Sequence, residues 1–334
     1  MRTIRYPIGP EDGGKTVERF LRGDQGFSGG VVLELKKLPR GLLVNGMRVR
    51  TVDLLSSGDV LEINLPDQPK RMPLCDIPVP ILYEDEDVIV YNKPAGMPCH
   101  QSGGHIYDTL SSVYAAHCAR TGEVTSFRAL NRLDMDTTGA VVAAKNRFAA
   151  GKLWKRVKKR YFALVRGEPP FPDGLIDLPI LPEHPLEMRR IVDPDGQEAR
   201  TEFHLLGTGD GVSLLGLVLH TGRTHQIRVH FSHLGLPLLG DAFYGGLDEP
   251  GLGRQALHCG TVRFPHAITG EMLEAAAPFP EDLLEAMARR GIEWREEWLR
   301  FAPAKNPTDL PRLLRRDQVT ADRPKDQDGK EGSL

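Results

Sequence analysis

Short apolar runs separated by turn residues recur along most of the chain. VIVY from Val88, AVVAAK from Ala140 and YFALVRG from Tyr161 have the length of buried strands, and Gly, Pro or polar residues bound each run. Strands outnumber helices, and the two do not alternate as regular βαβ units. We therefore expect an α+β fold whose sheet is mixed and largely antiparallel.

Two stretches of the same region have helical spacing instead. In AAGKLWKRV, the apolar residues Leu153, Trp154 and Val157 fall on one face of a predicted helix. In HTGRTHQIRVHFSHLG, we predict a short helix with Thr224 as its N-cap and Gly235 as its C-terminal stop.

The first 65 residues have the pattern of a separate, small α+β module. TVERFL and VVLELKKL have apolar residues at helical spacing, and GDVLEINL predicts a strand. Asn45-Gly46 lies between the apolar arms of GLLVNGMRV, which is a strong signal for a two-residue hairpin. The proline-rich residues 66–80 are typical of a linker, so we expect domains at 1–65 and 81–300.

The composition is ordinary for a globular protein except at the end of the chain. The 334 residues are 40% hydrophobic, and no apolar run approaches the roughly 20 residues that span a bilayer. The N-terminus lacks the apolar core of a signal peptide, so we expect a cytoplasmic protein without membrane association. Residues 301–334 are polar, and we expect a disordered tail there.

The four cysteines do not suggest a disulfide framework or a zinc site. They are far apart and form no C-x-x-C pair, which indicates reduced thiols. They are Cys75, Cys99, Cys118 and Cys259.

A strong local charge lies within a chain of small net charge. The net charge is −2, but the window from Lys145 to Arg166 has many Lys and Arg residues and no acid. Phosphate binding depends on local potential, so this window predicts contacts with a nucleic-acid backbone. The candidates on this basic helix are Lys155, Lys158 and Lys159; the alternative is a helix face that is merely solvated.

Asp134 is the strongest candidate for a reacting group. It follows Arg132-Leu133 on a predicted loop before a buried strand, and an Asp with a pKa of about 3.9 is anionic at neutral pH. The structural alternative is that Asp134 caps a turn and pairs with Arg132. A glycosidase pair of Asp134 and Asp136 is disfavoured, because such carboxyls lie about 5–9.5 Å apart on opposite sides of the scissile bond.

Two further stretches contain candidate binding residues. Arg228 lies one turn into the predicted helix, where it would point back over the helix start into a cleft. The histidines around it include no H-E-x-x-H, and their spacing forms no tetrahedral set, so we expect no metal. Tyr161 follows the basic window and is either a core aromatic or a platform for base stacking.

Taken together, these motifs resemble the RluA-type RNA pseudouridine synthases. LNRLDMDTTGAVVAAKN is similar to the family signature H-R-L-D-x-x-T-S-G, and KKRYFALVRG is similar to K-x-Y-x-A-x-V-x-G. VIVYNKPAGM, TGRTHQIRVHFSHLGLPLLGDAFYG and QALHCGTVRFPHAITGEMLEAAAPFPEDL resemble three further elements, in family order from about Ile81 to Leu284. The first 65 residues resemble an S4-like RNA-binding domain.

The resemblance implies an isomerase that converts specific uridines of structured RNA, ribosomal or transfer RNA, to pseudouridine without cofactor or metal. Asp134 falls on the essential aspartate and Arg228 on the arginine that family members pair with it. Tyr161 matches the tyrosine that packs on the target base, and Arg132 the arginine that holds the flipped-out nucleotide. Whether Asp134 attacks the ribose, attacks the base or removes a ribose proton stays open.

The sequence departs from the family pattern at two positions, and there is one rival function. Asn131 replaces the usual histidine, and Thr138 replaces serine but keeps the hydroxyl. The rival is a non-catalytic RNA-binding protein on the same scaffold, which would not require Asp134, Tyr161 and Arg228 together. We expect a monomer that binds structured RNA and not DNA.

Overall fold

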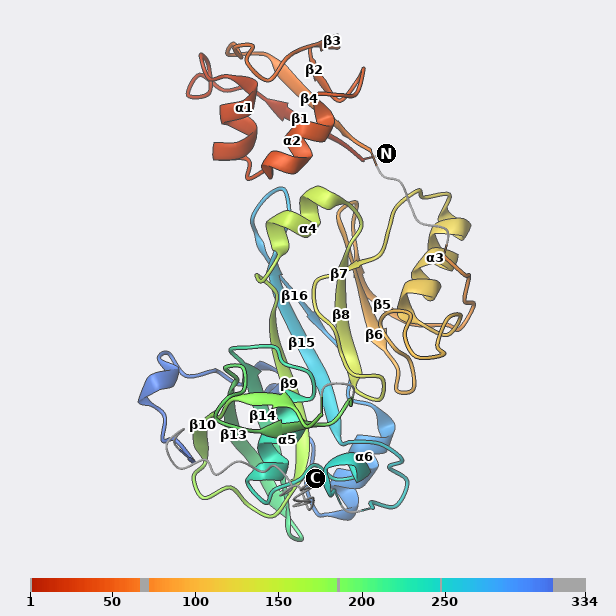
Figure 1. Cartoon of the computed structure of the whole chain (residues 1–334), viewed down its shortest axis with the longest axis vertical. Helices are drawn as coiled ribbons and strands as arrows, with labels where there is room; N and C mark the ends of the chain where they lie inside the picture. Colours follow the sequence, from red (N-terminus) through yellow and green to blue (C-terminus); the bar gives the residue numbers. More distant parts are fainter. Residues whose placement is uncertain (1, 67–71, 185–186, 247, 315–334) are drawn as a thin grey trace, which may run out of the picture. The chain divides into compact units, whose positions relative to one another are not determined.

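The computed structural model describes residues 2–66, 72–184, 187–246 and 248–314 (Figure 1). These residues form two compact units. The first unit falls within Met1–Met135, Gly139–Lys158 and Val262–Ala277, and the second within Asp136–Thr138, Lys159–Thr261 and Pro278–Leu334.

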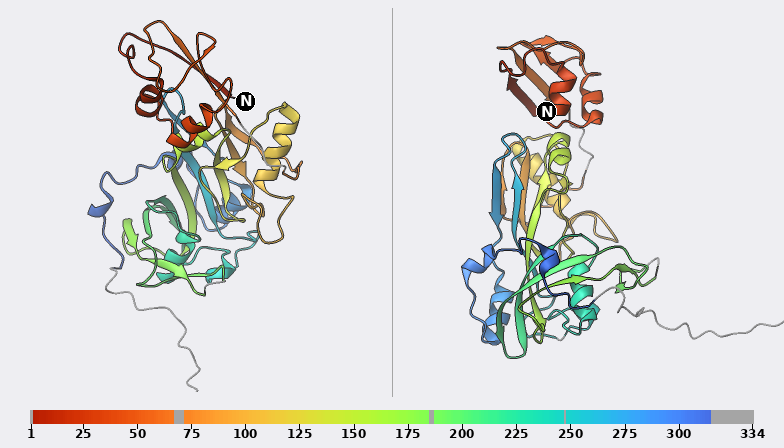
Figure 2. Two further views of the ribbon diagram at one scale, coloured as in Figure 1. Left: turned by 45° about the horizontal axis from the view of Figure 1, so that its top comes forward. Right: turned by 90° about the vertical axis from the view of Figure 1, so that its left-hand side faces the viewer.

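The N-terminal part of the first unit is a four-stranded antiparallel sheet in the order β1-β4-β2-β3, with helices on one of its faces (Figure 2). Its elements are β1 (Arg2–Pro7), α1 (Val17–Arg19), the π-helix η1 (Phe20–Asp24), α2 (Gly29–Leu35), β2 (Leu42–Val44), β3 (Met47–Arg48) and β4 (Val60–Leu65). Both predicted helices and the hairpin are confirmed. Asn45 and Gly46 have φ angles of 51° and 81°, the left-handed conformation that this turn requires.

Strand β1 was missed because its sequence, RTIRYP, is short and only two of its side chains face the core. Ile4 and Tyr6 are buried, and the less buried Thr3, Arg5 and Pro7 alternate with them. The strand is defined by its pairing with β4, which lies some sixty residues away in the chain (Arg2 opposite Leu65).

The rest of the first unit is built on the antiparallel strands β5, β6 and β8, with β7 also paired to β8 and β16 paired to β15. Its elements are β5 (Ile81–Glu84), β6 (Val88–Lys93), α3 (Leu110–Thr121), β7 (Arg128–Ala129), β8 (Thr138–Ala144), α4 (Arg147–Leu153) and β16 (Met272–Ala276). Every residue of β8 is buried, which explains its uninterrupted apolar sequence. Helix α3 escaped prediction because most of its sides are buried and its sequence lacks a clear polar face.

The predicted helix through Trp154 and Val157 is wrong in its second half. Helix α4 begins at the N-cap Asn146, whose side chain accepts a hydrogen bond from the backbone of Ala149, and it ends at Leu153. Lys155 has a left-handed backbone (φ 60°), and strand β9 starts at Lys158. The basic helix proposed from sequence is therefore a short helix, a turn and a strand.

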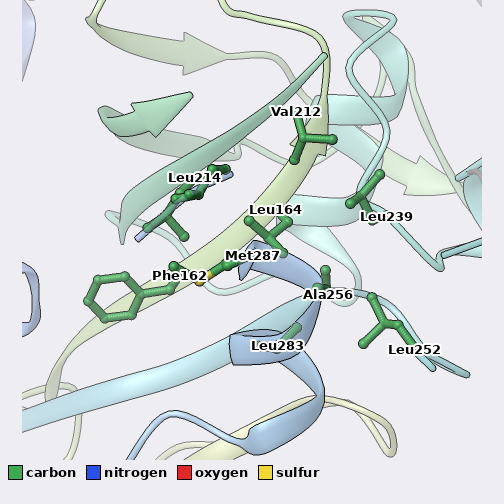
Figure 3. Close-up of a cluster of buried hydrophobic side chains, with 11 residues drawn as sticks. Phe162, Leu164, Val212, Leu214, Leu239, Leu252, Ala256, Leu283 and Met287 are labelled. Atoms are coloured by element: carbon green, nitrogen blue, oxygen red, sulfur yellow. The ribbon is translucent and has the colours of Figure 1, made fainter. Parts of the chain in front are cut away.

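The second unit contains the antiparallel strand order β10-β13-β14-β9. Its elements are β9 (Lys158–Arg166), β10 (Asp173–Asp177), β11 (Ile180–Pro182), β12 (Arg190–Val192), β13 (Arg200–Gly209), β14 (Val212–Leu219), α5 (Gln226–His233), the 3-10 helix η2 (Ala242–Tyr244), β15 (Leu257–Pro265), α6 (Glu281–Arg289) and the 3-10 helices η3 (Glu296–Arg300) and η4 (Pro307–Asp309). Strands β9 and β15 have residues in both units. The hydrophobic core of the second unit includes Phe162, Leu164, Leu214, Leu283 and Met287 (Figure 3).

Helix α5 starts one residue later than predicted. The N-cap position is taken by His225 in a left-handed conformation (φ 57°), and not by Thr224. The Gln226 side chain satisfies the turn instead, because its Oε1 accepts hydrogen bonds from the Arg223 backbone (3.0 Å) and the Thr221 hydroxyl (2.9 Å). The predicted stop is confirmed, since Gly235 follows the helix with φ 73°.

The prediction of a disordered tail is wrong for residues 301–314. The Phe301 ring packs edge-on against Phe162 (5.8 Å between centroids), and the Ala304 N–H donates to the buried carboxylate of Glu202 (2.6 Å). The Leu175 N–H donates to the Pro311 carbonyl (3.0 Å). Few apolar residues suffice here because individual contacts with residues of β9, β10 and β13 hold the segment. The rest of the predicted tail, 315–334, and residues 67–71 of the predicted linker lie outside the described residues.

The structure also bears on membrane spans and on the cysteines. None of the described helices has the length and apolar character to cross a membrane. The four cysteines are all free and buried.

Candidate active site

Asp134 lies partly exposed on a loop between β7 and β8, and the loop is fastened before it by Asn131. The buried side chain of Asn131 donates to the Ala140 carbonyl (3.1 Å) and accepts from the Val142 N–H (2.8 Å). An amide offers both a donor and an acceptor, so it can bridge two backbone groups of β8 at once. The residue that departs from the family pattern therefore has a structural role here.

A thiol holds the residue next to Asp134. The Leu133 N–H donates to the sulfur of Cys99 (3.5 Å), and the thiol donates to the Leu133 carbonyl (3.6 Å). Burial raises the pKa of the Cys99 thiol, and the charges of Lys93, Arg132 and Asp134 also act on it. These side chains therefore lie close together around the loop.

Lys93 fastens the loop after Asp134. Its ammonium group is fully buried and donates to the carbonyls of Pro94 (2.8 Å), Met97 (2.8 Å) and Met135 (2.7 Å). It thereby ties the turn after β6 to the residue that follows Asp134. Sequence reasoning missed this role; the available signal was a lysine ending an apolar strand.

The far end of the loop, Asp136–Thr138, belongs to the second unit and is fastened there. Buried Arg254 donates to the Asp136 carbonyl (3.2 Å) and is itself held by Asp282 (2.7 and 2.9 Å). The Thr138 hydroxyl bonds to His258 Nδ1 (2.9 Å). The Thr138 hydroxyl, which the usual serine would also supply, thus has a hydrogen-bond partner. Asp134 therefore lies on a loop whose two ends are both anchored.

Arg228 lies on α5 in the second unit and is nearly buried. Its Nε and Nη2 donate to the two carboxylate oxygens of Asp241 at 2.7 and 2.8 Å. The guanidinium also lies 5.0 Å from the ring centre of Tyr244 and 5.8 Å from that of Phe243. Sequence reasoning missed Asp241, although GDAFYG follows the helix within the matched family element.

The remaining predicted residues are on different elements. Tyr161 is buried in β9 of the second unit, opposite Leu217 of β14. Arg132 is exposed in the first unit. Lys155 and Lys158 are exposed, whereas Lys159 is half-buried and desolvation lowers its pKa.

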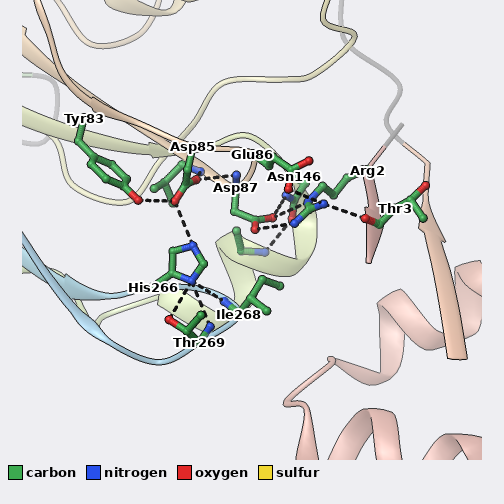
Figure 4. Close-up of polar contacts among 12 residues, drawn as sticks. Arg2, Thr3, Tyr83, Asp85, Glu86, Asp87, Asn146, His266, Ile268 and Thr269 are labelled. Atoms are coloured by element: carbon green, nitrogen blue, oxygen red, sulfur yellow. Dashed lines mark hydrogen bonds and ion pairs between the residues drawn. The ribbon is translucent and has the colours of Figure 1, made fainter. Parts of the chain in front are cut away.

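Asp85, Asp87 and His266 form an acidic cluster with the spacing of metal ligands, but its atoms are already bonded (Figure 4). His266 Nε2 lies 3.2 Å from Asp85, and Asn146 donates to Asp87 (2.7 Å). Arg2 donates to both oxygens of Asp87. Such a hydrogen-bonded junction ties the N-terminal strand to β6 and does not have the character of a metal centre.

A cavity of about 570 Å³ opens in the first unit beside helix α3. Its lining includes His100, Phe127 and Arg128. Burial, and then the charge of Arg132, lower the pKa of His100. The cavity is therefore close to the Asp134 loop.

Comparisons with known proteins decide the family. A model of the RNA pseudouridylate synthase family matches residues 87–233. The Bacillus subtilis protein named uncharacterized RNA pseudouridine synthase YjbO is 38% identical over 80% of this chain and 96% of its own length. The chain belongs to the RNA pseudouridine synthase family. This pseudouridine synthase is therefore an isomerase with an RNA substrate, as its resemblance to the RluA-type enzymes implied.

Other relatives agree. The Haemophilus influenzae ribosomal large subunit pseudouridine synthase D is 34% identical over 76% of this synthase and 80% of its own length. The structure of human RNA pseudouridylate synthase domain containing 1 is 28% identical and superposes with a TM-score of 0.54, covering 69% of this chain and 97% of the human one. The α+β fold with a mixed, largely antiparallel sheet is confirmed.

Proposed function

We propose that this synthase converts specific uridines of ribosomal RNA to pseudouridine, with Asp134 as the reacting carboxylate. The observation that carries the assignment of Asp134 is its place on a loop anchored on both sides, by Asn131 and by Lys93. A catalytic group must be held in position while staying accessible, and Asp134 is partly exposed. The relative named for the large ribosomal subunit supports ribosomal RNA as the target.

The proposed reaction rearranges one nucleotide without adding or removing a group. The N-glycosidic bond to N1 of uracil breaks, the base turns, and the ribose carbon bonds to C5. The C5 proton is lost to solvent, and N1 gains a proton. The Asp134 carboxylate serves this exchange by attack on the sugar or the base or by removal of a ribose proton.

The other assignments belong to the same proposal. Arg132 holds the flipped-out nucleotide, Tyr161 packs on the uracil, and Arg228 supports Asp134, as in the enzymes that the sequence resembles. Flipping a nucleotide costs a few kcal/mol. Stacking on an aromatic ring returns about 1–3 kcal/mol. Phosphate contacts from the basic stretch around Lys158 supply the remainder, and a single copy of the chain acts on structured RNA.

The test is the substitution Asp134→Asn, with Asp136→Asn as a control of equal charge two residues away. We expect Asp134→Asn to abolish tritium release from 5-tritiated uridine in ribosomal RNA while binding stays within about twofold, because only one charge is removed. Asp136→Asn should keep its activity. Tritium release by Asp134→Asn at the wild-type rate would remove Asp134 from the reaction.

The target RNA needs a separate measurement. Pseudouridines are mapped in total RNA from cells with and without the gene. We expect sites in ribosomal RNA to disappear with the gene. Loss confined to transfer RNA would overturn the ribosomal assignment and leave the reaction unchanged.

A further inference from the structure

The loop that follows Cys99 displays two large apolar side chains to solvent. Ile106 is 48% exposed and Tyr107 is 69% exposed. Exposing an aromatic ring to water gives up the stabilisation that burial would provide, and adjacent exposed apolar side chains can mark a contact site for a partner.

This loop is ordered by its own hydrogen bonds. Ser102 and His105 exchange backbone hydrogen bonds (3.2 and 2.8 Å) across the left-handed turn Gly103-Gly104. His105 Nδ1 lies 2.6 Å from the Asp108 carboxylate. The Ile106 carbonyl accepts from the side chains of Gln101 and Ser112, each at 3.1 Å. Tyr107 is therefore presented on a preorganised backbone, which reduces the entropy lost on binding.

The loop starts at the candidate active site. Cys99, the residue before it, exchanges two hydrogen bonds with Leu133, the neighbour of Asp134. The charge of Arg132 reaches His100, the first residue of the loop. A nucleotide next to the reacting one would thus find this loop nearby.

We propose that Tyr107 is a stacking platform for an unpaired base of the RNA substrate, next to the uridine that is isomerised. The inference rests on the proposed function, because it takes the RNA bound at Asp134 as the ligand. Proteins that recognise folded RNA commonly stack splayed-out bases on aromatic rings. The stacked base covers the ring that water otherwise contacts, and it is not the target base assigned to Tyr161.

The experiment compares Tyr107→Ala, Tyr107→Leu and Tyr107→Phe by filter binding to ribosomal RNA purified from cells that lack the enzyme. Losing a stacked base should weaken binding about 5- to 100-fold for Tyr107→Ala, while the ring in Tyr107→Phe should restore it. Tyr107→Leu should remain weak because it has no flat face. The slope of log Kd against log salt should not change, since no phosphate contact is lost.

Controls separate stacking from other effects. Phe171→Ala removes a 43% exposed aromatic ring from the second unit and should bind normally. Unfolding temperatures of the Tyr107 variants should equal the wild-type value. Equal binding by Tyr107→Ala and wild type would overturn the proposal, and so would full recovery by Tyr107→Leu. Ala119→Trp fills the cavity beside α3. If this variant weakened binding and Tyr107→Ala did not, the cavity would bind the RNA, and the proposal would fail.

The same samples distinguish this proposal from the proposed function. If wild-type protein binds ribosomal RNA through Tyr107 but releases no tritium, the reaction assignment fails and the platform stands. If tritium release is normal and all Tyr107 variants bind alike, the platform alone fails. If wild-type protein binds no ribosomal RNA, the ribosomal assignment fails, and the same variants are compared on transfer RNA, where equal binding by Tyr107→Ala and wild type overturns the platform.

Discussion

Lys93 shows how a residue type is matched to its surroundings. An ammonium group has three donors and no acceptor, and here it meets three carbonyls in a buried site. Asn131 supplies one donor and one acceptor where the backbone of β8 offers one of each. Both side chains are buried polar groups with their bonding capacity used to hold the backbone around Asp134. Replacing either would leave unpaired polar atoms beside the reacting carboxylate.

His230 gives a pH prediction at the same scale. It is fully buried in α5 with Nδ1 2.9 Å from the Thr201 hydroxyl, and burial lowers its pKa to about 4. Because this pKa lies below the unfolded value of about 6.5, protons favour unfolding. Its stabilising contribution is present above about pH 6.5 and is lost as the pH falls toward 4. Between pH 7 and pH 4.5, the loss should be about 2–3 kcal/mol.

Urea unfolding at these two pH values measures this contribution. His230→Gln should remove that part of the pH dependence, whereas the exposed control His184→Gln should keep it. An unchanged difference in unfolding free energy for His230→Gln would mean that another group is responsible.

At the scale of elements, strand β9 corrects the picture of a basic helix. Leu153 and Val157 are both buried, as a helix would require, but Trp154 is 62% exposed and the backbone turns at Lys155. Strand β9 begins at Lys158, and its residues 160–166 pair with β14. In a strand, successive side chains point to opposite faces. Lys158 and Lys159 therefore cannot face the same phosphate track.

The strand geometry changes what lysine replacement should do. Lys158→Gln and Lys155→Gln remove exposed charges, so each should lower the slope of log K against log salt by about 0.7–0.9 if it contacts a phosphate. Lys159→Gln should leave the slope unchanged, because that side chain is half-buried. Binding to ribosomal RNA at several salt concentrations gives the slopes, with exposed Lys305→Gln as the control. A drop for Lys159 alone would reverse this assignment.

At the scale of the whole molecule, the proposed site residues are divided between the two units. Arg132 and Asp134 belong to the first unit, and Tyr161 and Arg228 belong to the second. The chain passes from one unit to the other directly after Met135, within the loop that carries Asp134. The proposed assignments therefore draw on residues of both units.

A double-mutant cycle tests whether Asp134 and Arg228 act as a pair in the folded enzyme. Arg228→Met should reduce activity and lower the free energy of unfolding, because it removes the partner of the buried Asp241 carboxylate and the proposed partner of Asp134. Adding Asp134→Asn should recover part of that stability while the enzyme stays inactive. The coupling energy between two residues in contact is typically about 0.5–3 kcal/mol, and denaturant unfolding measures it. Strictly additive losses would separate the two residues, and Arg228 would then serve only its partner Asp241.

Features that depend on neighbours in the chain were predictable from the sequence. The hairpin at Asn45-Gly46 and the strands at Val88, Ala140 and Tyr161 follow from local apolar patterns and turn residues. The family was predicted from five sequence motifs that occur in family order. These motifs are recognisable because the chemistry of the site requires particular residue types in them.

Features that depend on distant partners were decided only by the tertiary structure. The bond of Arg228 to Asp241, the anchoring of Thr138 by His258 and the packing of Phe301 on Phe162 join residues 13 to 139 positions apart. Helix α3 and the strand geometry of Lys158 likewise depend on what packs or pairs with them. A buried polar group or a short apolar segment is stabilised by whatever lies opposite it, and no local pattern records that partner.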